Sequence, residues 1–164
     1  MGKEIEKRFL LKKGCSVPIP KNFNYTKIHQ GYLLGKKDRQ VRVRLSFDEL
    51  SKQSFMCVKF TEGPVRDEFE YEIPFKDGQS IYKKCKWSLE KIRCSFKIDG
   101  YHYDMDSYPN EDRNGASELV TVEVEFKSIK DMEKWKKPNW LGEEISGLKK
   151  YSNIILAKKN LKFQ

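Results

Sequence analysis

The chain has 164 residues, of which 38% are hydrophobic, 35% are charged and 13% are aromatic. The aromatic fraction argues against a disordered chain, and the length suits one domain, over residues 1–164, with a core of its own. The balance of 33 basic and 24 acidic residues gives a net charge of +9, which favours polyanions such as nucleic acid, an anionic membrane or phosphorylated small molecules.

Neither the N-terminus nor the cysteines have the pattern of a secreted or membrane protein. The chain is charged from Lys3 onward, and it lacks a run of about 18 apolar residues that could span a bilayer. Its four cysteines form no CxxC pair and no metal-finger spacing. We therefore expect reduced thiols in a cytoplasmic protein without a membrane partner, with Cys57 and Cys94 facing a packed side.

Polar and apolar residues alternate with a period of two along most of the chain, which predicts an antiparallel β protein. Asp99-Gly100 lies between two alternating runs and is a strong hairpin signal. The predicted strands cover residues 2–12, 26–34, 39–48, 54–61, 66–73, 90–99, 101–108 and 117–127.

Three segments have helical character. The first covers residues 77–86 with Asp77 or Ser80 as a cap, and the second covers 129–137 with a Ser128 cap. The third, 148–160, places its apolar residues on one stripe. The predicted class is α+β, mainly antiparallel β.

The first predicted strand carries its charges at every second position. Successive side chains of a strand point to opposite faces, so Glu4, Glu6 and Arg8 share one face and Ile5 lies on the other. Neighbours on one face are about 7 Å apart, close enough for two carboxylates to act on one hard cation. One such strand is weak evidence, because one wet face is normal for an antiparallel sheet.

The later strands repeat this pattern with like charges along one face. Arginine pairs suit phosphate or carboxylate, and paired carboxylates suit a divalent cation. Their charged faces carry Arg42 and Arg44; Lys59; Arg66, Glu68, Glu70 and Glu72; Lys91, Arg93 and Lys97; His102, Asp104 and Asp106; and Glu123 and Glu125. His29 and His102 are interpreted as structural, although His102 shares a face with Asp104 and Asp106.

An eight-stranded sheet closed on itself would bring these faces into one lumen, with a cationic wall for a phosphate chain and an acidic corner for a metal. The opposite, apolar face then needs cover, and three short helices are too few for all of it. A homodimer that covers the rest is our hypothesis.

The ordered motifs resemble the CYTH superfamily, the triphosphate tunnel metalloenzymes, and in particular its short bacterial inorganic triphosphatases. The run from Glu4 to Leu10 resembles the ExExK signature of that superfamily, with Arg8 at the position of the lysine. Further matches extend over essentially the whole chain. They are Gln30–Leu33, Val41–Arg44, Val58–Phe60, Arg66–Pro74, Lys91–Arg93, Asp104–Asp106, Val122–Glu125, Pro138–Glu144 and Tyr151–Ala157.

The resemblance implies a closed eight-stranded tunnel that hydrolyses the phosphoanhydride bond of a triphosphate with Mg²⁺ or Mn²⁺. It also assigns roles to the charged residues. The implied metal ligands are Glu4, Glu6, Glu123 and Glu125; the phosphate-binding residues are Arg42, Arg44, Lys59, Arg66, Lys91 and Arg93; the tunnel-lining acids are Glu68, Glu70, Glu72, Asp104 and Asp106; and the catalytic residues are Arg8, Glu4 and Glu6.

Two other functions remain open at this point. A CYTH-type adenylate cyclase needs the same metal and phosphate wall together with an adenine pocket. A polyphosphate-binding or nucleic-acid-binding module would suit the +9 charge. The acidic residues on the same faces argue against that module, because a polyanion binder gains nothing from them. A small-molecule triphosphate, most simply inorganic tripolyphosphate, is the expected partner.

Overall fold

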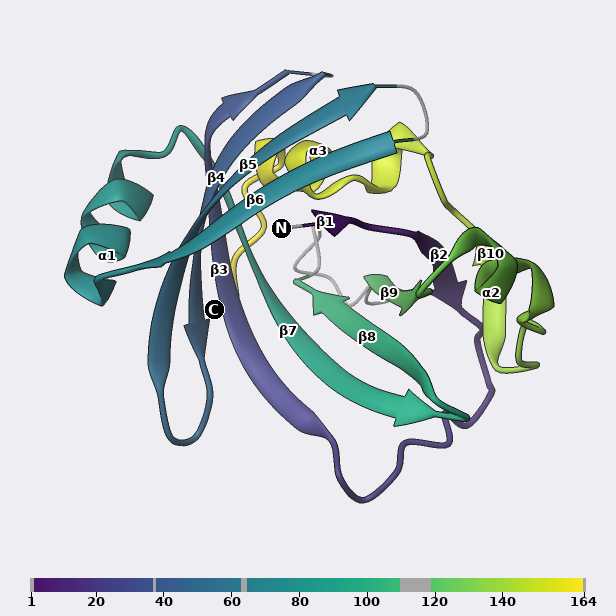
Figure 1. The fold of residues 1–164 in the computed structure, drawn as a ribbon. Helices are drawn as coiled ribbons and strands as arrows, with labels where there is room; N and C mark the ends of the chain where they lie inside the picture. Colours follow the sequence, from purple (N-terminus) through teal and green to yellow (C-terminus); the bar gives the residue numbers. More distant parts are fainter. Residues whose placement is uncertain (1, 37, 63–64, 110–118, 164) are drawn as a thin grey trace.

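The protein is one strongly curved antiparallel sheet with short helices packed against it (Figure 1). The computed structural model describes residues 2–36, 38–62, 65–109 and 119–163. Its strands are β1 (Gly2–Lys3), β2 (Glu6–Leu11), β3 (Asn24–Gly35), β4 (Arg39–Phe47), β5 (Lys52–Glu62), β6 (Val65–Ile73), β7 (Trp87–Ile98), β8 (Tyr101–Tyr108), β9 (Leu119–Glu125) and β10 (Leu141–Glu144).

The strand order is β1-β6-β5-β4-β3-β7-β8-β9-β2-β10. β1 and β2 follow each other in the chain, yet β1 pairs with β6 and β2 pairs with β9. Glu4 and Ile5 therefore carry the chain from one end of the sheet to the other. The curvature of the sheet brings these two ends together, because the three Cα–Cα steps from Lys3 to Glu6 can span only about 10 Å.

Seven of the eight predicted strands each correspond to one observed strand, and Asp99 and Gly100 adopt the positive φ angles, 52° and 81°, that their hairpin turn requires. The prediction of one strand over residues 2–12 is wrong, because the two parts of this segment pair with different strands. β10 was not predicted. The described ladder has ten strands and runs from β1 to β10 without closing by hydrogen bonds, unlike the predicted closed sheet of eight. Residues 117 and 118 of the last predicted strand lie outside the described residues.

The helices are shorter than predicted or displaced. α1 (Phe75–Lys84) begins directly after Pro74 and has no side-chain cap, so the prediction of Asp77 or Ser80 as a cap is wrong. α2 (Ile129–Lys134) is capped as predicted by Ser128, whose hydroxyl accepts from the Asp131 N–H at 3.0 Å. No helix of the described residues is long and apolar enough to cross a membrane.

The C-terminal tail is a short 3₁₀-helix η1 (Lys149–Tyr151) followed by α3 (Asn153–Lys158), not the single predicted helix. The break lies at Ser152, which is extended and caps α3 through its hydroxyl. The tail packs against Tyr32, Leu89 and Tyr108, which are buried and belong to one cluster with Ile154, Leu156, Ala157 and Leu161.

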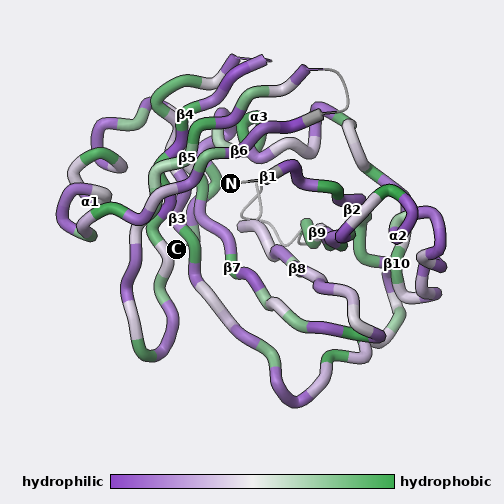
Figure 2. Tube along the Cα trace, viewed as in Figure 1, coloured by the Kyte–Doolittle hydropathy of each residue, from purple (hydrophilic) through white to green (hydrophobic). Residues whose placement is uncertain are grey.

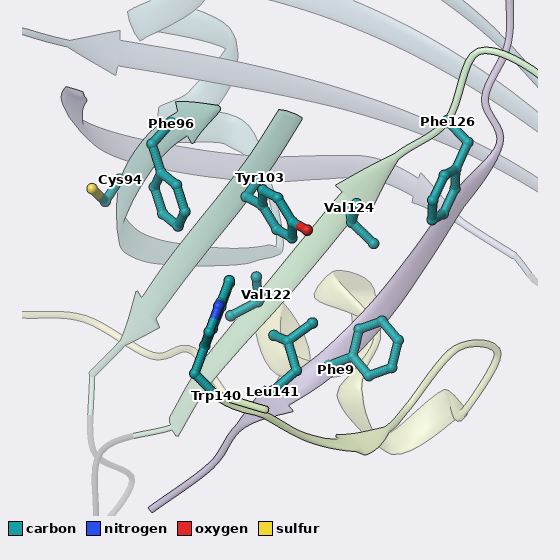
Figure 3. Close-up of a cluster of buried hydrophobic side chains, with 9 residues drawn as sticks. All are labelled: Phe9, Cys94, Phe96, Tyr103, Val122, Val124, Phe126, Trp140 and Leu141. Atoms are coloured by element: carbon teal, nitrogen blue, oxygen red, sulfur yellow. The ribbon is translucent and has the colours of Figure 1, made fainter. Parts of the chain in front are cut away.

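A second cluster forms the core between the sheet and the segment that contains β10 (Figure 3). Its members are Phe9, Cys94, Phe96, Tyr103, Val122, Val124, Phe126, Trp140 and Leu141. These strand residues alternate in sequence with charged ones, and Figure 2 shows the resulting change between hydrophilic and hydrophobic residues along the strands. Burial of the apolar face fixes the side on which the charged residues lie, because a shift of one residue in the strand pairing would move every side chain of that strand to the other face of the sheet.

The apolar face is not fully covered. On β5 and β6, Phe60, Phe69 and Tyr71 keep 45%, 37% and 57% of their surface exposed. α1 packs against β4 and β5 further along, where Gly78 lies so close to Ser54 that a Cβ atom would be 2.4 Å from the Ser54 Cβ. This agrees with the expectation that the short helices are too few to hide the whole face.

Candidate active site

The pairing register brings the predicted site residues onto one face of the sheet. On β4, β5 and β6, Arg42 lies opposite Cys57, and Cys57 lies opposite Glu70. Lys59 lies opposite Glu68. Directly opposite residues of an antiparallel pair project to the same side. Cys57 therefore faces the charged site, and the prediction that it faces a packed side is wrong. The sequence could have predicted this, because residues two apart in a strand share a face and Cys57 is two residues from Lys59. Cys94 lies in the core as predicted.

The same register continues through β7, β8, β9 and β2. Arg93 lies opposite Asp106. Asp104 lies opposite Glu123, and Glu123 lies opposite Arg8. Charged residues from seven strands thus share one concave face.

On the β4–β6 side, acids and bases alternate across the strands. Arg42 contacts Glu68 at 3.0 Å and Glu70 at 3.3 Å, and Arg44 contacts Glu70 at 2.7 Å. Lys59 contacts Glu68 at 2.8 Å. Although burial opposes ionisation, a hydrogen bond from Glu4 and the cations Lys59 and Arg42 lower the pKa of Glu68 to about 2. The cations are therefore held close together by carboxylates between them. Glu72 lies at the exposed end of the same face, 3.5 Å from Gln53.

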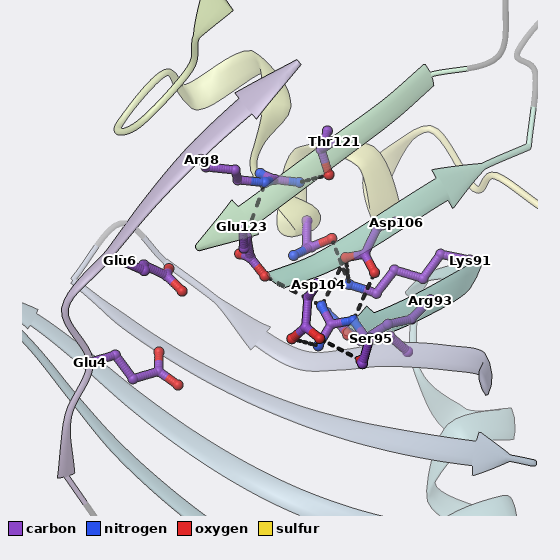
Figure 4. A network of polar contacts seen from close by, with 12 residues as sticks. Glu4, Glu6, Arg8, Lys91, Arg93, Ser95, Asp104, Asp106, Thr121 and Glu123 are labelled. Carbon is purple, nitrogen blue, oxygen red and sulfur yellow. Dashed lines mark hydrogen bonds and ion pairs between the residues drawn. The ribbon is translucent and has the colours of Figure 1, made fainter. Parts of the chain in front are cut away.

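On the β7–β9 side, the guanidinium of Arg93 is the centre of the network (Figure 4). It donates to both carboxylate oxygens of Asp106 at 2.7 and 2.8 Å and to Asp104 at 3.0 Å. It also contacts Glu123 at 3.3 Å. Lys91, which is only 2% exposed, donates to Asp106 at 2.8 Å. Burial would raise the pKa of Asp106, but Arg93 and Lys91 hold it below its usual value, which favours the ionised carboxylate.

Glu4 and Glu6 connect the two sides, and their carboxylates point toward the network that includes Asp104 and Glu123 (Figure 4). Glu4 lies 3.9 Å from Lys59, and Glu6 lies 3.0 Å from Arg66. Partial burial and contact with Glu68 raise the pKa of Glu4 to about 8. Burial, followed by the negative charge of Glu123, raises the pKa of Glu6 to about 7. Burial is thus the largest cause of both pKa shifts, and the nearby cations Lys59 and Arg66 do not offset it.

The four predicted metal ligands lie in this region but do not converge on one point. Glu6 lies directly opposite Glu125 in the β2–β9 pairing. Among the described residues, the groups of three ligand atoms within 4.8 Å of one another are Cys57, Glu68 and Glu70, and His102, Asp104 and Glu125. Only Glu125 belongs to both the predicted and the observed sets. All four predicted ligands offer hard oxygen atoms, and Glu6 and Glu125 are directly opposed carboxylates, an arrangement that suits a divalent cation.

Arg8 lies on the charged face and also contacts the C-terminal tail that contains η1 and α3. Its guanidinium donates to Tyr108 Oη at 2.9 Å, to Thr121 Oγ1 at 3.3 Å and to the Tyr151 carbonyl oxygen. Its Nε lies 4.0 Å from Glu123. The Tyr108 hydroxyl in turn donates to Asn153 Oδ1 at 2.7 Å. Arg8 therefore joins β2, β8 and β9 to η1, a contact that the sequence alone did not indicate.

The chain is similar to known proteins along nearly its whole length. No family profile matches the chain. It is 35% identical over 161 residues to an inorganic triphosphatase of Acetivibrio thermocellus, a match that covers 96% of this chain and 95% of the relative. It is 30% identical over 156 residues to an inorganic triphosphatase of Nitrosomonas europaea, with 94% of this chain and 96% of the relative covered.

Solved structures show the same fold. A crystal structure of an inorganic triphosphatase superposes with a TM-score of 0.62 at 27% identity, over 96% of this chain and 95% of that one. A protein from Pyrococcus horikoshii superposes with a TM-score of 0.52 at 15% identity, over 79% of this chain and 82% of that one. The second likeness concerns the fold alone.

Proposed function

The chain belongs to the inorganic triphosphatases of the CYTH superfamily, and we propose that it hydrolyses the phosphoanhydride bond of a linear triphosphate, inorganic tripolyphosphate first of all. The observation that carries this proposal is the concave face on which arginines and lysines alternate with carboxylates. The cations suit the oxygens of a phosphate chain, and the unbalanced acids suit a divalent cation.

We propose that the face lines a tunnel. Glu4 and Ile5 cross between the two ends of the sheet, and the contacts of Glu4 with Lys59 and of Glu6 with Arg66 join the same ends through side chains. A substrate inside would be surrounded by charged groups with little competing water, where electrostatic interactions are strongest.

In the proposed reaction a water oxygen bonds to the terminal phosphorus, the bond to the bridging oxygen breaks, and diphosphate leaves while the water proton passes to solvent. Fixed cations neutralise the charge that grows on the phosphoryl oxygens. In the proposed binding mode the phosphate replaces Glu68 and Glu70 as the partner of the guanidinium groups. The cations assigned to this role are Arg42, Arg44, Lys59, Arg66, Lys91 and Arg93.

Glu4, Glu6, Glu123 and Glu125 are the residues that would hold Mg²⁺ or Mn²⁺, and the ion would supply charge neutralisation and Lewis-acid polarisation of the terminal phosphoryl group. Arg8 is assigned a positioning role, because its guanidinium is already bound by Tyr108, Thr121 and Tyr151 and approaches Glu123. Asp104 and Asp106 orient Arg93, and Glu72 lines the exposed end of the face.

The proposal also includes the cellular location and the oligomeric state of the protein. All four cysteines are free thiols in the structure, which supports a reducing, cytoplasmic location. The exposed Phe60, Phe69 and Tyr71 support a homodimer in which a second copy covers them. Sedimentation that gives a strict monomer at micromolar concentration would contradict the dimer.

The experiment that tests the function is a substrate panel with Mg²⁺ and with Mn²⁺. Tripolyphosphate, ATP and diphosphate are incubated with wild type, Glu4→Gln, Glu125→Gln and the control Glu133→Gln, whose side chain is exposed on α2. We expect hydrolysis of tripolyphosphate that both site variants abolish and the control retains. Full activity in both site variants would contradict the metal assignment.

The same panel separates the alternatives. Cyclic AMP formed from ATP would favour a cyclase. RNA binding without metal, together with no turnover of any triphosphate, would favour a nucleic-acid or polyphosphate-binding module.

A further inference from the structure

His102, Asp104 and Glu125 form a group at one end of the charged face. The expected metal site consists of carboxylates alone, so it gives no role to the imidazole of His102. One ligand atom from each lies within 4.8 Å of the other two. His102 lies directly opposite Glu125 in the β8–β9 pairing, and Asp104 follows two residues later on the same face. We propose that His102 is a nitrogen ligand of the metal site, so that the site prefers a first-row transition ion such as Mn²⁺ or Co²⁺ over Mg²⁺. This inference rests on the proposed metal-dependent function.

The separation of the two closest atoms suits a shared cation. His102 Nε2 and Asp104 Oδ1 are 3.0 Å apart. Metal–nitrogen and metal–oxygen bonds of first-row ions are about 2.1 Å, and two such ligands at a right angle are therefore about 3.0 Å apart. The same distance suits a hydrogen bond, so the experiment must distinguish a bound metal from a proton between these atoms.

Asp104 is already oriented for such a role. Its Oδ2 accepts from Arg93 at 3.0 Å, and its Oδ1 accepts from the Ser95 hydroxyl. The side chain is 10% exposed, whereas that of His102 is 35% exposed and open to an ion from solvent. Partners of this kind fix a ligand and increase metal affinity.

The carboxylate directly opposite Glu125 also favours a cation. In the ladder, Glu125 lies between His102 on β8 and Glu6 on β2, and directly opposed carboxylates repel. The cation opposite His102 on β7 is Lys97, and both Lys97 and Glu125 are exposed, so water weakens the repulsion of the ion by Lys97 as well as the repulsion between Glu125 and Glu6. A divalent ion at His102 would therefore also relieve the repulsion between Glu125 and Glu6.

An imidazole changes the selectivity that carboxylates alone would give. Mg²⁺ prefers oxygen ligands and gives up its water reluctantly, whereas the affinity of nitrogen ligands rises from Mn²⁺ to Co²⁺. The loss of His102 should thus affect Mn²⁺ and Co²⁺ much more than Mg²⁺.

The chain offers a clean spectroscopic test, because His29 and His102 are its two histidines. His29 lies on β3, 3.8 Å from Glu90 and against the rings of Phe47 and Tyr82, at a position of the opposite parity to Gln30 on the charged face. Electron spin-echo modulation of Mn²⁺ detects a directly bound imidazole nitrogen. The protein, without a histidine tag and without substrate, is loaded with Mn²⁺ as wild type, His102→Gln and the matched control His29→Gln.

We expect nitrogen modulation in wild type and His29→Gln and its loss in His102→Gln. Titration should show the Kd of Mn²⁺ rising at least about tenfold in His102→Gln, with a change below about threefold for Mg²⁺. Nitrogen modulation that is absent from wild type, or that persists in His102→Gln, would overturn the inference.

The two proposals can fail separately. Hydrolysis of tripolyphosphate by a wild type without nitrogen modulation would reject the His102 ligand and leave the triphosphatase standing. Nitrogen modulation that depends on His102, in a protein that hydrolyses no triphosphate, would support the His102 ligand and reject the triphosphatase.

Discussion

Arg44 on β4 and Glu70 on β6 meet at 2.7 Å across the intervening strand β5. The carboxylate also lies 3.3 Å from Arg42, so one acid holds two of the cations proposed to bind phosphate. In the proposed binding mode, a triphosphate competes with this carboxylate for the two guanidinium groups. The strength of this ion pair therefore opposes substrate binding.

We predict that Glu70→Gln lowers the KM for tripolyphosphate, because the substrate no longer competes with this carboxylate. A partly exposed ion pair contributes about 1 kcal/mol, which corresponds to about a fivefold decrease. Initial rates against substrate concentration measure it. Glu72→Gln is the matched control, two residues along the same face, and should leave KM unchanged. A higher KM in Glu70→Gln would mean that the carboxylate instead orients the arginines for the substrate.

The opposed pair of Glu6 and Glu125 predicts an unusual effect on stability. Without metal, Glu125→Gln should be more stable than wild type by up to about 1 kcal/mol, because a repulsion between opposed carboxylates is removed. With a divalent ion at about 100 times its Kd, wild type should gain about 2.7 kcal/mol and the variant much less. Thermal unfolding in EDTA and in Mn²⁺ tests both. Glu133→Gln should behave as wild type, and equal metal stabilisation of Glu125→Gln would exclude Glu125 as a ligand.

Arg8→Lys restores the signature residue of the superfamily but should destabilise this protein. A lysine cannot reproduce the planar set of donors that reaches Tyr108, Thr121 and the Tyr151 carbonyl together. We expect a loss of about 1–3 kcal/mol in the free energy of unfolding, measured in urea, and faster amide exchange in α3.

Arg39→Lys is the control for this substitution, because Arg39 pairs only with its exposed neighbour Asp38 among the contacts of the described residues. It should change stability by less than about 0.5 kcal/mol. Unchanged exchange in α3 of Arg8→Lys would mean that the tail is held by its apolar contacts alone.

The sequence predicted the strands and the face of most site residues, because both depend on local alternation. Glu4 and Glu6, or Glu123 and Glu125, must share a face wherever their strands lie. The partners of these residues could not be predicted in the same way. The contact of Glu6 with Arg66 depends on how the two ends of the sheet meet, which no local pattern encodes.

The features that the sequence did not reveal have the same origin. The predicted first strand is interrupted at Glu4 and Ile5, because β1 and β2 pair with strands at different ends of the sheet. β10 has four residues and depends on the edge of β2 for its hydrogen bonds. The contact of Arg8 with Tyr151 joins residues 143 positions apart. Each is set by tertiary pairing, which overrides local propensity.

The burial of Lys91 predicts how stability depends on pH. Burial lowers its pKa to about 8 in the folded protein, from a normal value of 10.5. Between these values the unfolded chain binds more protons than the folded one, so this group makes stability rise with pH. The rise is about 1.4 kcal/mol per pH unit, or about 3 kcal/mol between pH 8 and 10.5. Below pH 8 the ammonium is charged in both states and its contribution is constant.

Lys91→Met removes this titration, and Arg93 remains as the cation beside Asp106. The difference in unfolding free energy between wild type and Lys91→Met should therefore shift in favour of wild type by about 3 kcal/mol from pH 8 to 10.5. Urea unfolding at half-unit intervals measures it, and the subtraction cancels the titration of groups common to both proteins. Lys97→Met, at an exposed position on the same strand, should show no such shift. A constant difference for Lys91→Met would mean that Asp106 keeps the buried ammonium charged throughout this range.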